Sequence, residues 1–376
     1  MSAPLQRVKT ARAAVWLVRA ALAFWVALIF FYRPGLCRVP GAAFMDMVNG
    51  TAPRPYVTRA LFPAVIRLAV AATPAALREA VADSAAATRL RATWFVGREL
   101  GWRREDFYPQ LVGFLLTVLC LAGFSATIER LWRHFYRPAQ PQGALLSLAA
   151  LLGLPPFFKY TNYLYDFPTL LLYSLALLLM ARRVWGWYLI VLALACLCKE
   201  TAVLLIGVFA LGGAARPARA ADGCSAVTAD GGSWRARTVP RFREWDGRRL
   251  GLLAAQVSIW AGARAWLWRL FRANPGRTLE FHLFNHNLRE LCAPYTAADA
   301  LAWLWIAALV LHGFGRQPRL LRAGVGMLLP LAGLCLFFGY VDELRDYYEV
   351  YAPALLLGAC TFWRVLGRPI ETVSDA

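Results

Sequence analysis

Residues 164–213 read LYDFPTLLLYSLALLLMARRVWGWYLIVLALACLCKETAVLLIGVFALGG. The long apolar runs in this stretch are separated only by the pairs Arg182-Arg183 and Lys199-Glu200. A helix of about twenty apolar residues crosses the roughly 30 Å hydrocarbon core of a bilayer. The stretch therefore predicts consecutive helices in a membrane, with charge confined to the turns between them.

Apolar runs of this kind recur along the chain. The predicted spans lie near 13–32, 108–128, 143–158, 164–181, 184–198, 200–213, 250–271, 297–313, 321–340 and 348–365. The chain is 59% hydrophobic and 17% charged, whereas a soluble protein carries about 25% charged residues. We predict an all-α, polytopic transmembrane helical protein of about ten spans, in which residues 1–376 form a single integral membrane domain.

The first apolar run, 13–31, follows Arg7, Lys9 and Arg12, an order that also occurs in signal peptides. The run is longer than the hydrophobic region of a cleaved signal, and no small-x-small cleavage site follows promptly. We therefore predict that it is retained as the first span.

The formal net charge of +19 has two explanations, nucleic-acid binding and the excess of basic residues on the inner side of a membrane protein. With the N-terminus inside, the predicted inner segments and adjoining span ends hold 21 basic and 7 acidic residues, above all in the basic inner loop 214–249. The arginines are spread over several loops rather than one aromatic-lined face, so no nucleic-acid partner is expected. We predict that both termini are cytoplasmic. The high Ala and Arg content is associated with bacterial sources, so we expect the bacterial plasma (inner) membrane.

The runs 184–198 and 200–213 leave their own topology open, because Lys199-Glu200 stands between them. They are either two short, partly penetrating helices or one long kinked helix. The second alternative reverses the sidedness of everything that follows. The distribution of basic residues favours two helices.

Two predicted outer segments are substantial. The first outer loop, 33–107, is expected to be partly helical, because 64–82 and 85–100 have helix-rich composition. In the second, 273–296, apolar residues recur at helical spacing and predict an amphipathic helix on the outer membrane surface. These residues are Phe281, Phe284, Leu288 and Leu291, with His282, Asn285, His286 and Arg289 on another face.

Metal and disulfide signals are weak. His282 and His286 are four residues apart, but the sequence places no third ligand beside them, so no metal site is predicted. The eight cysteines form no CxxC pair. Only Cys37 and Cys292 lie in predicted outer segments, so one disulfide between them is the alternative to two free thiols.

Charged residues near the outer ends of spans are functional candidates, because ionisable groups are costly in a bilayer. Asp46 lies early in the first outer loop, where a partly buried carboxylate suits a general base; a capping or solvated aspartate is the alternative. Arg54 and Arg59 follow among prolines, and their planar guanidinium groups suit a phosphate. The alternative is a stiff turn that meets anionic lipid headgroups.

Tyr165 and Asp166 join the third and fourth predicted spans. They are candidates for substrate binding, or else an interfacial tyrosine and a helix cap. Lys199 and Glu200 stand between apolar runs and require partners; neighbouring residues do not face each other on a helix, so each is expected to have a different one. A structural ion pair with another span is the alternative to substrate binding.

Glu343 and Arg345 precede the last predicted span and are placed to bind a polar substrate, to brace other loops or to form a solvated turn. Arg19 is unusual, since it lies near the middle of the first span. It is expected to pair with a carboxylate that the sequence does not identify.

The order of these features resembles the GT-C superfamily of polytopic membrane glycosyltransferases, which use polyprenyl-phosphate-linked sugars as donors. The likeness is carried by five short elements. They are Asp46, the run Pro55-Tyr56-x-x-Arg59-x-Leu61-x-Pro63, Tyr165-Asp166, Leu197-Cys198-Lys199-Glu200-Thr201 and Glu343-Leu344-Arg345. The resemblance covers about residues 13–213 and the last outer loop.

The resemblance implies sugar transfer from a polyprenyl-phosphate donor to an unidentified acceptor at the outer face of the membrane. Asp46 would be the general base on the acceptor, and Arg59, Lys199 and Arg345 would hold the lipid phosphate. No cofactor is firmly implied, and a divalent cation is left open. A transporter or lipid flippase and a non-catalytic membrane scaffold are the alternatives; charges at one face and no visible internal repeat count against a transporter.

Overall fold

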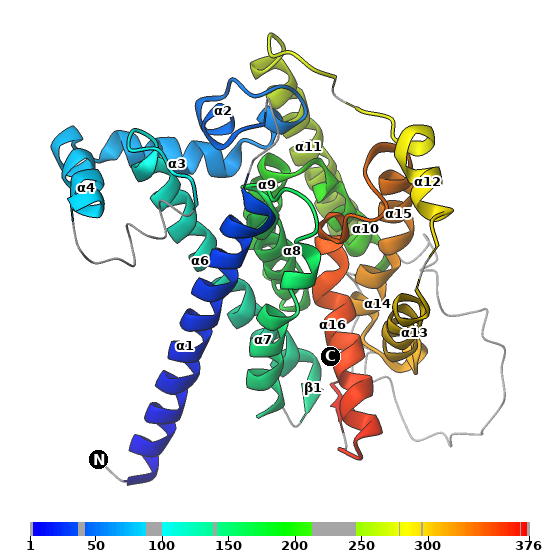
Figure 1. The fold of residues 1–376 in the computed structure, drawn as a ribbon. Helices are drawn as coiled ribbons and strands as arrows, with labels where there is room; N and C mark the ends of the chain where they lie inside the picture. The colour runs from blue at the N-terminus through cyan, green and yellow to red at the C-terminus, as the bar shows by residue number, and fades with distance from the viewer. Residues whose placement is uncertain are drawn as a thin grey trace, which may run out of the picture.

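A computed structural model describes residues 3–36, 42–87, 100–137, 141–212, 246–277, 279–294, 296–368 and 370–373. This part of the chain is mostly helical with almost no sheet, as predicted (Figure 1). Its only strand pair is short and antiparallel, and joins β1 (Tyr136–Arg137) to β2 (Glu371–Thr372). The basic inner loop 214–249 falls mostly outside the described residues.

The longer helices follow the predicted apolar runs. They are α1 (Ala3–Phe30), α6 (Phe107–Phe135), α7 (Gln142–Leu152), α8 (Asp166–Ala181), α9 (Trp185–Cys198), α10 (Val203–Gly212), α11 (Gly247–Leu270), α13 (Ala297–Leu311), α14 (Arg319–Gly326), α15 (Leu328–Phe338) and α16 (Tyr348–Val365). Single helical turns connect several of them. These are η1 (Phe31–Gly35), η2 (Tyr56–Thr58), η3 (Pro155–Phe157), η4 (Glu200–Ala202), η8 (Phe314–Arg316) and η9 (Leu344–Tyr347).

Four helical segments of the described chain are long and apolar enough to cross a membrane. They are Ala13–Arg33, Phe107–Phe135, Ala297–Arg316 and Arg319–Phe338. Leu61–Ala72 and Ala75–Ser84 meet the same test only together, and are bent by 102° at the break between them. The predicted number of about ten spans is therefore not confirmed. Several helices at predicted positions are too short to cross roughly 30 Å alone, because a helix rises only about 1.5 Å per residue.

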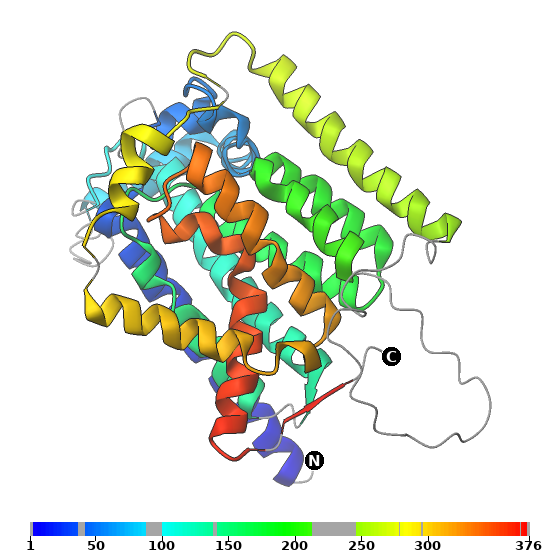
Figure 2. The ribbon, with the colours of Figure 1, turned by 90° about the vertical axis from the view of Figure 1, so that its right-hand side faces the viewer.

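α9 and α10 form a hairpin rather than one kinked helix. Tyr188 and Cys196 of α9 are joined by hydrogen bonds to Gln256 and Arg264 of α11, so α9 runs parallel to α11. α10 runs the other way, since Arg249 of α11 donates to the carbonyl of Ala210. The two members are roughly 21 Å and 15 Å long, and the prediction of two short helices is confirmed (Figure 2).

The first outer loop is helical over α2 (Phe44–Asn49), α3 (Leu61–Ala72) and α4 (Ala75–Ala87). The prediction that this loop is partly helical is confirmed; within 64–82 the helix is interrupted at Thr73, whose backbone is extended before Pro74. Residues 88–99 lie outside the described part. Taken together, the bent α3–α4 pair is long and apolar enough to cross a membrane.

The predicted amphipathic helix within 273–296 is shorter than expected. Helical structure covers only η7 (Leu283–Asn287) and α12 (Leu288–Leu291). Asn287 is buried, and its amide donates to three carbonyls near the end of α15, which fixes the segment to that helix. Phe281 and Phe284 remain exposed, as the amphipathic prediction requires.

The core is built around α6 and α8, which pack against each other and against α7, α9 and α16. Trp132 and Phe124 of α6 and Phe167 of α8 are almost fully buried there. α2 and α12 lie at one end of the bundle, and the start of α1 and the end of α16 at the other (Figure 1). The two predicted outer segments therefore share an end, and its assignment to the outer face stays a prediction.

Candidate functional site

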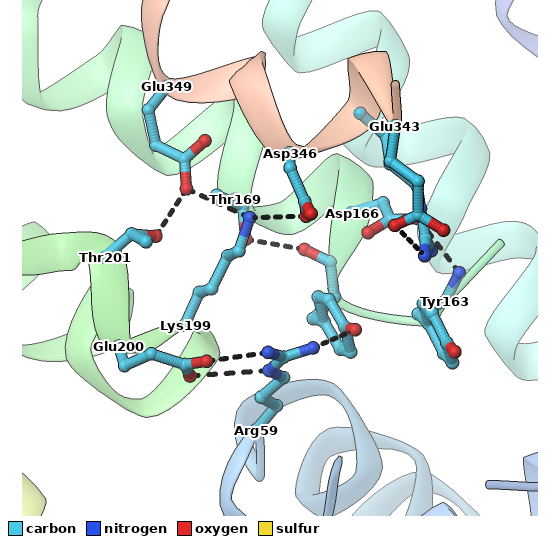
Figure 3. A network of polar contacts seen from close by, with 12 residues as sticks. Arg59, Tyr163, Asp166, Thr169, Lys199, Glu200, Thr201, Glu343, Asp346 and Glu349 are labelled. Carbon is cyan, nitrogen blue, oxygen red and sulfur yellow. Dashed lines mark hydrogen bonds and ion pairs between the residues drawn. The ribbon is translucent and has the colours of Figure 1, made fainter. Parts of the chain in front are cut away.

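A cluster of buried charges gathers at the end of the bundle that carries α2 and α12 (Figures 1 and 3). Its members come from four separate segments: the chain after η2, the start of α8, the turn between α9 and α10, and η9 with the start of α16. They are Arg59, Tyr163, Tyr165, Asp166, Lys199, Glu200, Glu343, Arg345, Asp346 and Glu349, which we call the polar cluster.

Arg59 binds Glu200 through two of its three guanidinium nitrogens. Its Nη2 lies 2.6 Å from Glu200 Oε1, and its Nε lies 3.4 Å from Oε2. The guanidinium also stacks on the ring of Tyr165, 4.2 Å from its centre, and donates to the hydroxyl of that residue. Burial lowers the pKa of Arg59, but the Glu200 carboxylate outweighs that effect, so the pKa is raised above its ordinary value.

Lys199 interrupts the helical hairpin because its backbone is extended where α9 ends. Its Nζ lies 3.2 Å from Glu349 Oε1 and 3.5 Å from Asp346 Oδ1. The side chain of Glu349 is 0% exposed, and it also accepts a hydrogen bond from Thr201. The prediction that Lys199 and Glu200 have different partners is confirmed.

Arg345 lies between two carboxylates. Its Nη2 donates to Glu343 at 2.8 Å, and its Nη1 lies 3.6 Å from Asp166. Asp166 accepts a hydrogen bond from the backbone of Tyr163, and Arg345 stacks over the ring of that tyrosine. Burial raises the pKa of Glu343 to about 7, although Arg345 acts in the opposite direction. Glu343 can thus exchange a proton near neutral pH.

Asp46 does not belong to the hydrogen-bond network of the polar cluster. Its backbone carbonyl accepts from Thr51 and Ala52, and its side chain lines a separate cavity of about 370 Å³. Trp102 and Asp106 line the same cavity. No hydrogen bond or ion pair within the described residues joins Asp46 to the polar cluster.

Arg54 also stays outside the polar cluster. Its backbone nitrogen donates to the carbonyl of Pro275, which links the first outer loop to the second. Asn274 strengthens that link by donating to the carbonyls of Gly50 and Ala52. The backbone of Arg54 thus connects the two outer segments, whereas Arg59 points into the polar cluster. Whether Arg54 contacts a phosphate or lipid headgroups stays a prediction.

Sequence reasoning missed two charged members of the polar cluster, Asp346 and Glu349, and a charged neighbour of it, Arg264. The two carboxylates follow Asp342 at a spacing that repeats on one face of a helix, a signal that was available in the sequence. Arg264 of α11 approaches Glu200, with Nη1 at 3.8 Å from Oε2. Nothing in the sequence ties α11 to that glutamate, because the contact depends on how α11 packs against the hairpin.

A second network lies beside the polar cluster and is centred on Asp342. Lys159 binds Asp342 Oδ2 at 2.6 Å, Tyr160 donates to the same oxygen, and His286 Nε2 lies 2.9 Å from Oδ1. Partial burial raises the pKa of Asp342, but these hydrogen bonds outweigh it and lower the pKa to about 2. Asp342 therefore holds the segments of Lys159-Tyr160 and His286 to its own, and His286 also packs against Tyr340.

Arg19 finds its carboxylate in Glu129 of α6, and it also donates to Ser125 and Ser147. Arg19 is 1% exposed, so this contact is a buried ion pair that joins α1, α6 and α7. Its partners are separate from those of the polar cluster, and its role is structural.

The described residues contain no group of three or more His, Cys, Asp or Glu side chains placed to hold a metal ion. Cys37 lies outside the described residues, and Cys292 is a free, exposed thiol. No protein-family model, curated protein or solved structure matches this chain. The molecule is thus defined as an all-helical protein with helices able to span a membrane and with buried charges gathered at one end.

Proposed function

We propose that this chain is a membrane glycosyltransferase that transfers a sugar from a polyprenyl-phosphate donor at the outer face of the membrane. One observation supports it above all. Arg59, Lys199 and Arg345, which are far apart in the sequence, lie in one buried cluster at the end opposite to the start of α1. Buried cations are costly, and they suit an anionic leaving group such as a lipid phosphate.

The reaction joins an acceptor hydroxyl to the anomeric carbon of the sugar and breaks the bond from that carbon to the phosphate oxygen. The proton of the hydroxyl passes to a general base, and the phosphate leaves as an anion. We assign the base to Asp46 and the anion to Arg59, Lys199 and Arg345, each of which is paired with a carboxylate in this structure. Because no hydrogen bond or ion pair among the described residues joins Asp46 to these cations, the assignment requires a donor and an acceptor that together span both sites. The cavity beside Asp46, lined by Trp102 and Asp106, has the aromatic and polar character that an acceptor sugar requires.

The direct test uses purified protein in lipid nanodiscs with polyprenyl-phosphate hexose and pentose donors. Release of the polyprenyl phosphate and formation of a new glycoside are both measured. Asp46→Asn should stop turnover without changing the thermal unfolding temperature. Asp83→Asn is the matched control, because Asp83 pairs with Arg104 on the exposed surface of α4. Normal turnover in Asp46→Asn would show that Asp46 is not the general base.

A transporter or lipid flippase is the second candidate, and a specific observation favours it. The α9–α10 hairpin and the bent α3–α4 pair are the kind of interrupted helices that form binding sites in transporters. Movement of a labelled lipid-linked sugar across proteoliposomes, without release of the sugar, would favour this function. A scaffold is favoured instead if alanine at Arg59, Lys199 and Glu200 leaves both activities and growth unchanged.

A further inference from the structure

Glu200 holds two arginines at once. Arg59 contacts both of its oxygens, and Arg264 Nη1 lies 3.8 Å from Oε2. Two guanidinium groups around one small anion is the arrangement that binds a phosphate, because a phosphate presents the same pair of oxygens as a carboxylate.

Both arginines are held in place without Glu200. Arg59 stacks on Tyr165 and donates to its hydroxyl. Arg264 donates from Nη2 to the backbone carbonyl of Cys196. Its Nε is buried and has no hydrogen-bond partner among the described residues. The two cations would therefore keep their positions if the carboxylate between them left.

Glu200 itself is the carboxylate in the polar cluster best able to move. Its side chain is 39% exposed, against 24% for Asp346 and 0% for Glu349. Its backbone stays fixed, because Trp260 donates to the carbonyl of Glu200 and Tyr173 donates to that of Thr201. Rotation of the side chain alone releases Arg59, with no change in the hairpin.

We propose that Arg59 and Arg264 form a binding site for a phosphate ester, and that Glu200 occupies this site until the ligand displaces it. The inference rests on the proposed function only in naming the donor's phosphate as the ligand. It gives Glu200 the opposite role from a substrate-binding residue, because the glutamate competes with the substrate. It also adds Arg264 to the site.

The test measures binding to the purified full chain in nanodiscs, with inorganic phosphate, pyrophosphate and a polyprenyl monophosphate as probes. Glu200→Gln should bind the phosphate probes about fivefold more tightly, the scale of a partly exposed ion pair. The matched control is Glu79→Gln, the same loss of charge on an exposed face of α4, which should leave affinity unchanged. Equal or weaker binding by Glu200→Gln overturns the proposal.

Arg264→Gln should weaken binding about tenfold, and Arg264→Lys keeps the test valid if the first variant fails to fold. Unchanged phosphate affinity in Arg264→Gln, or in Arg264→Lys if only that variant folds, overturns the two-arginine site. Tighter binding of all three probes to Glu200→Gln identifies the phosphate group as the ligand, and an effect confined to the polyprenyl probe identifies a lipid-linked phosphate. This binding test does not depend on sugar transfer. If the variants bind phosphate as expected but no glycoside is formed, the phosphate site stands and the proposed transferase function is rejected.

Discussion

Lys199→Met separates a structural ion pair from a substrate contact at the centre of the polar cluster. The substitution keeps the length and apolar stem of the side chain but removes the cation that lies 3.2 Å from Glu349. Glu349 is then left as a fully buried carboxylate whose remaining partner is the Thr201 hydroxyl. Removing one partner of a buried pair costs about 3–5 kcal/mol. The loss at Asp346 adds little, because that side chain is 24% exposed and can be hydrated.

The assay is thermal unfolding of the purified protein in one detergent. Lys199→Met should lower the unfolding temperature by on the order of 5–10 °C. The double variant Lys199→Met/Glu349→Gln should regain most of the lost unfolding temperature, since the buried carboxylate of Glu349 is then replaced by a neutral amide. Lys159→Met is the matched control and should cost at most about 1 kcal/mol, because that lysine is half exposed. A small loss in Lys199→Met, or no recovery in the double variant, refutes the reasoning.

Three further predictions concern other parts of the chain. Arg19→Leu should destabilise the protein by about 1–3 kcal/mol in denaturant titrations, because Glu129 then keeps only Arg133 as a partner and Ser125 and Ser147 lose their donor. Arg19→Leu/Glu129→Leu should cost less, since Arg133 is 40% exposed and can be hydrated; a larger loss in the double variant would contradict this. Because the pKa of Glu343 is about 7 in the folded protein against an ordinary 4.5, its contribution to stability is present below pH 4.5 and lost as the pH rises through 7. Glu343→Gln should make the unfolding temperature less dependent on pH between 4.5 and 7. If the variant and the original protein show the same pH dependence, the raised pKa of Glu343 is wrong. Cys292 is exposed directly after α12, in the predicted second outer segment, so in a variant with no other cysteine an impermeant maleimide should label it from outside. Labelling only after the membrane is opened would mean that this end of the bundle faces the cytoplasm.

The helical positions followed from the sequence because burial in lipid requires long apolar runs with satisfied backbones. An interruption at Lys199 was predictable for the same reason, since a charged pair cannot lie in the middle of an apolar helix at low cost. The sequence left one kinked helix open as the alternative, and the structure decided for the hairpin. Helix length was less predictable. The helix-rich run 64–82 is interrupted at Thr73, whose extended backbone is the one that Pro74 imposes on the residue before it, so a local signal for the break was present. The 102° bend between α3 and α4 was not predictable from it.

The candidate site was predictable residue by residue but not as an arrangement. Arg59, Lys199 and Arg345 stood out because charge near a bilayer is costly. Their partners did not, since pairing depends on distant helices meeting. Arg264 is the clearest case: it belongs to α11, and only the packing of α11 against the hairpin brings it to Glu200.

The sequence alone determined the all-helical fold, the apolar segments and the need of each buried charge for a partner, because these follow from local composition and the cost of desolvation. The tertiary structure decided which charges meet. It placed Arg59 on Glu200, Lys199 on Glu349 and Arg19 on Glu129, and it left Asp46 in a cavity of its own. Those choices depend on contacts between residues far apart in the chain, which only the packed helices specify.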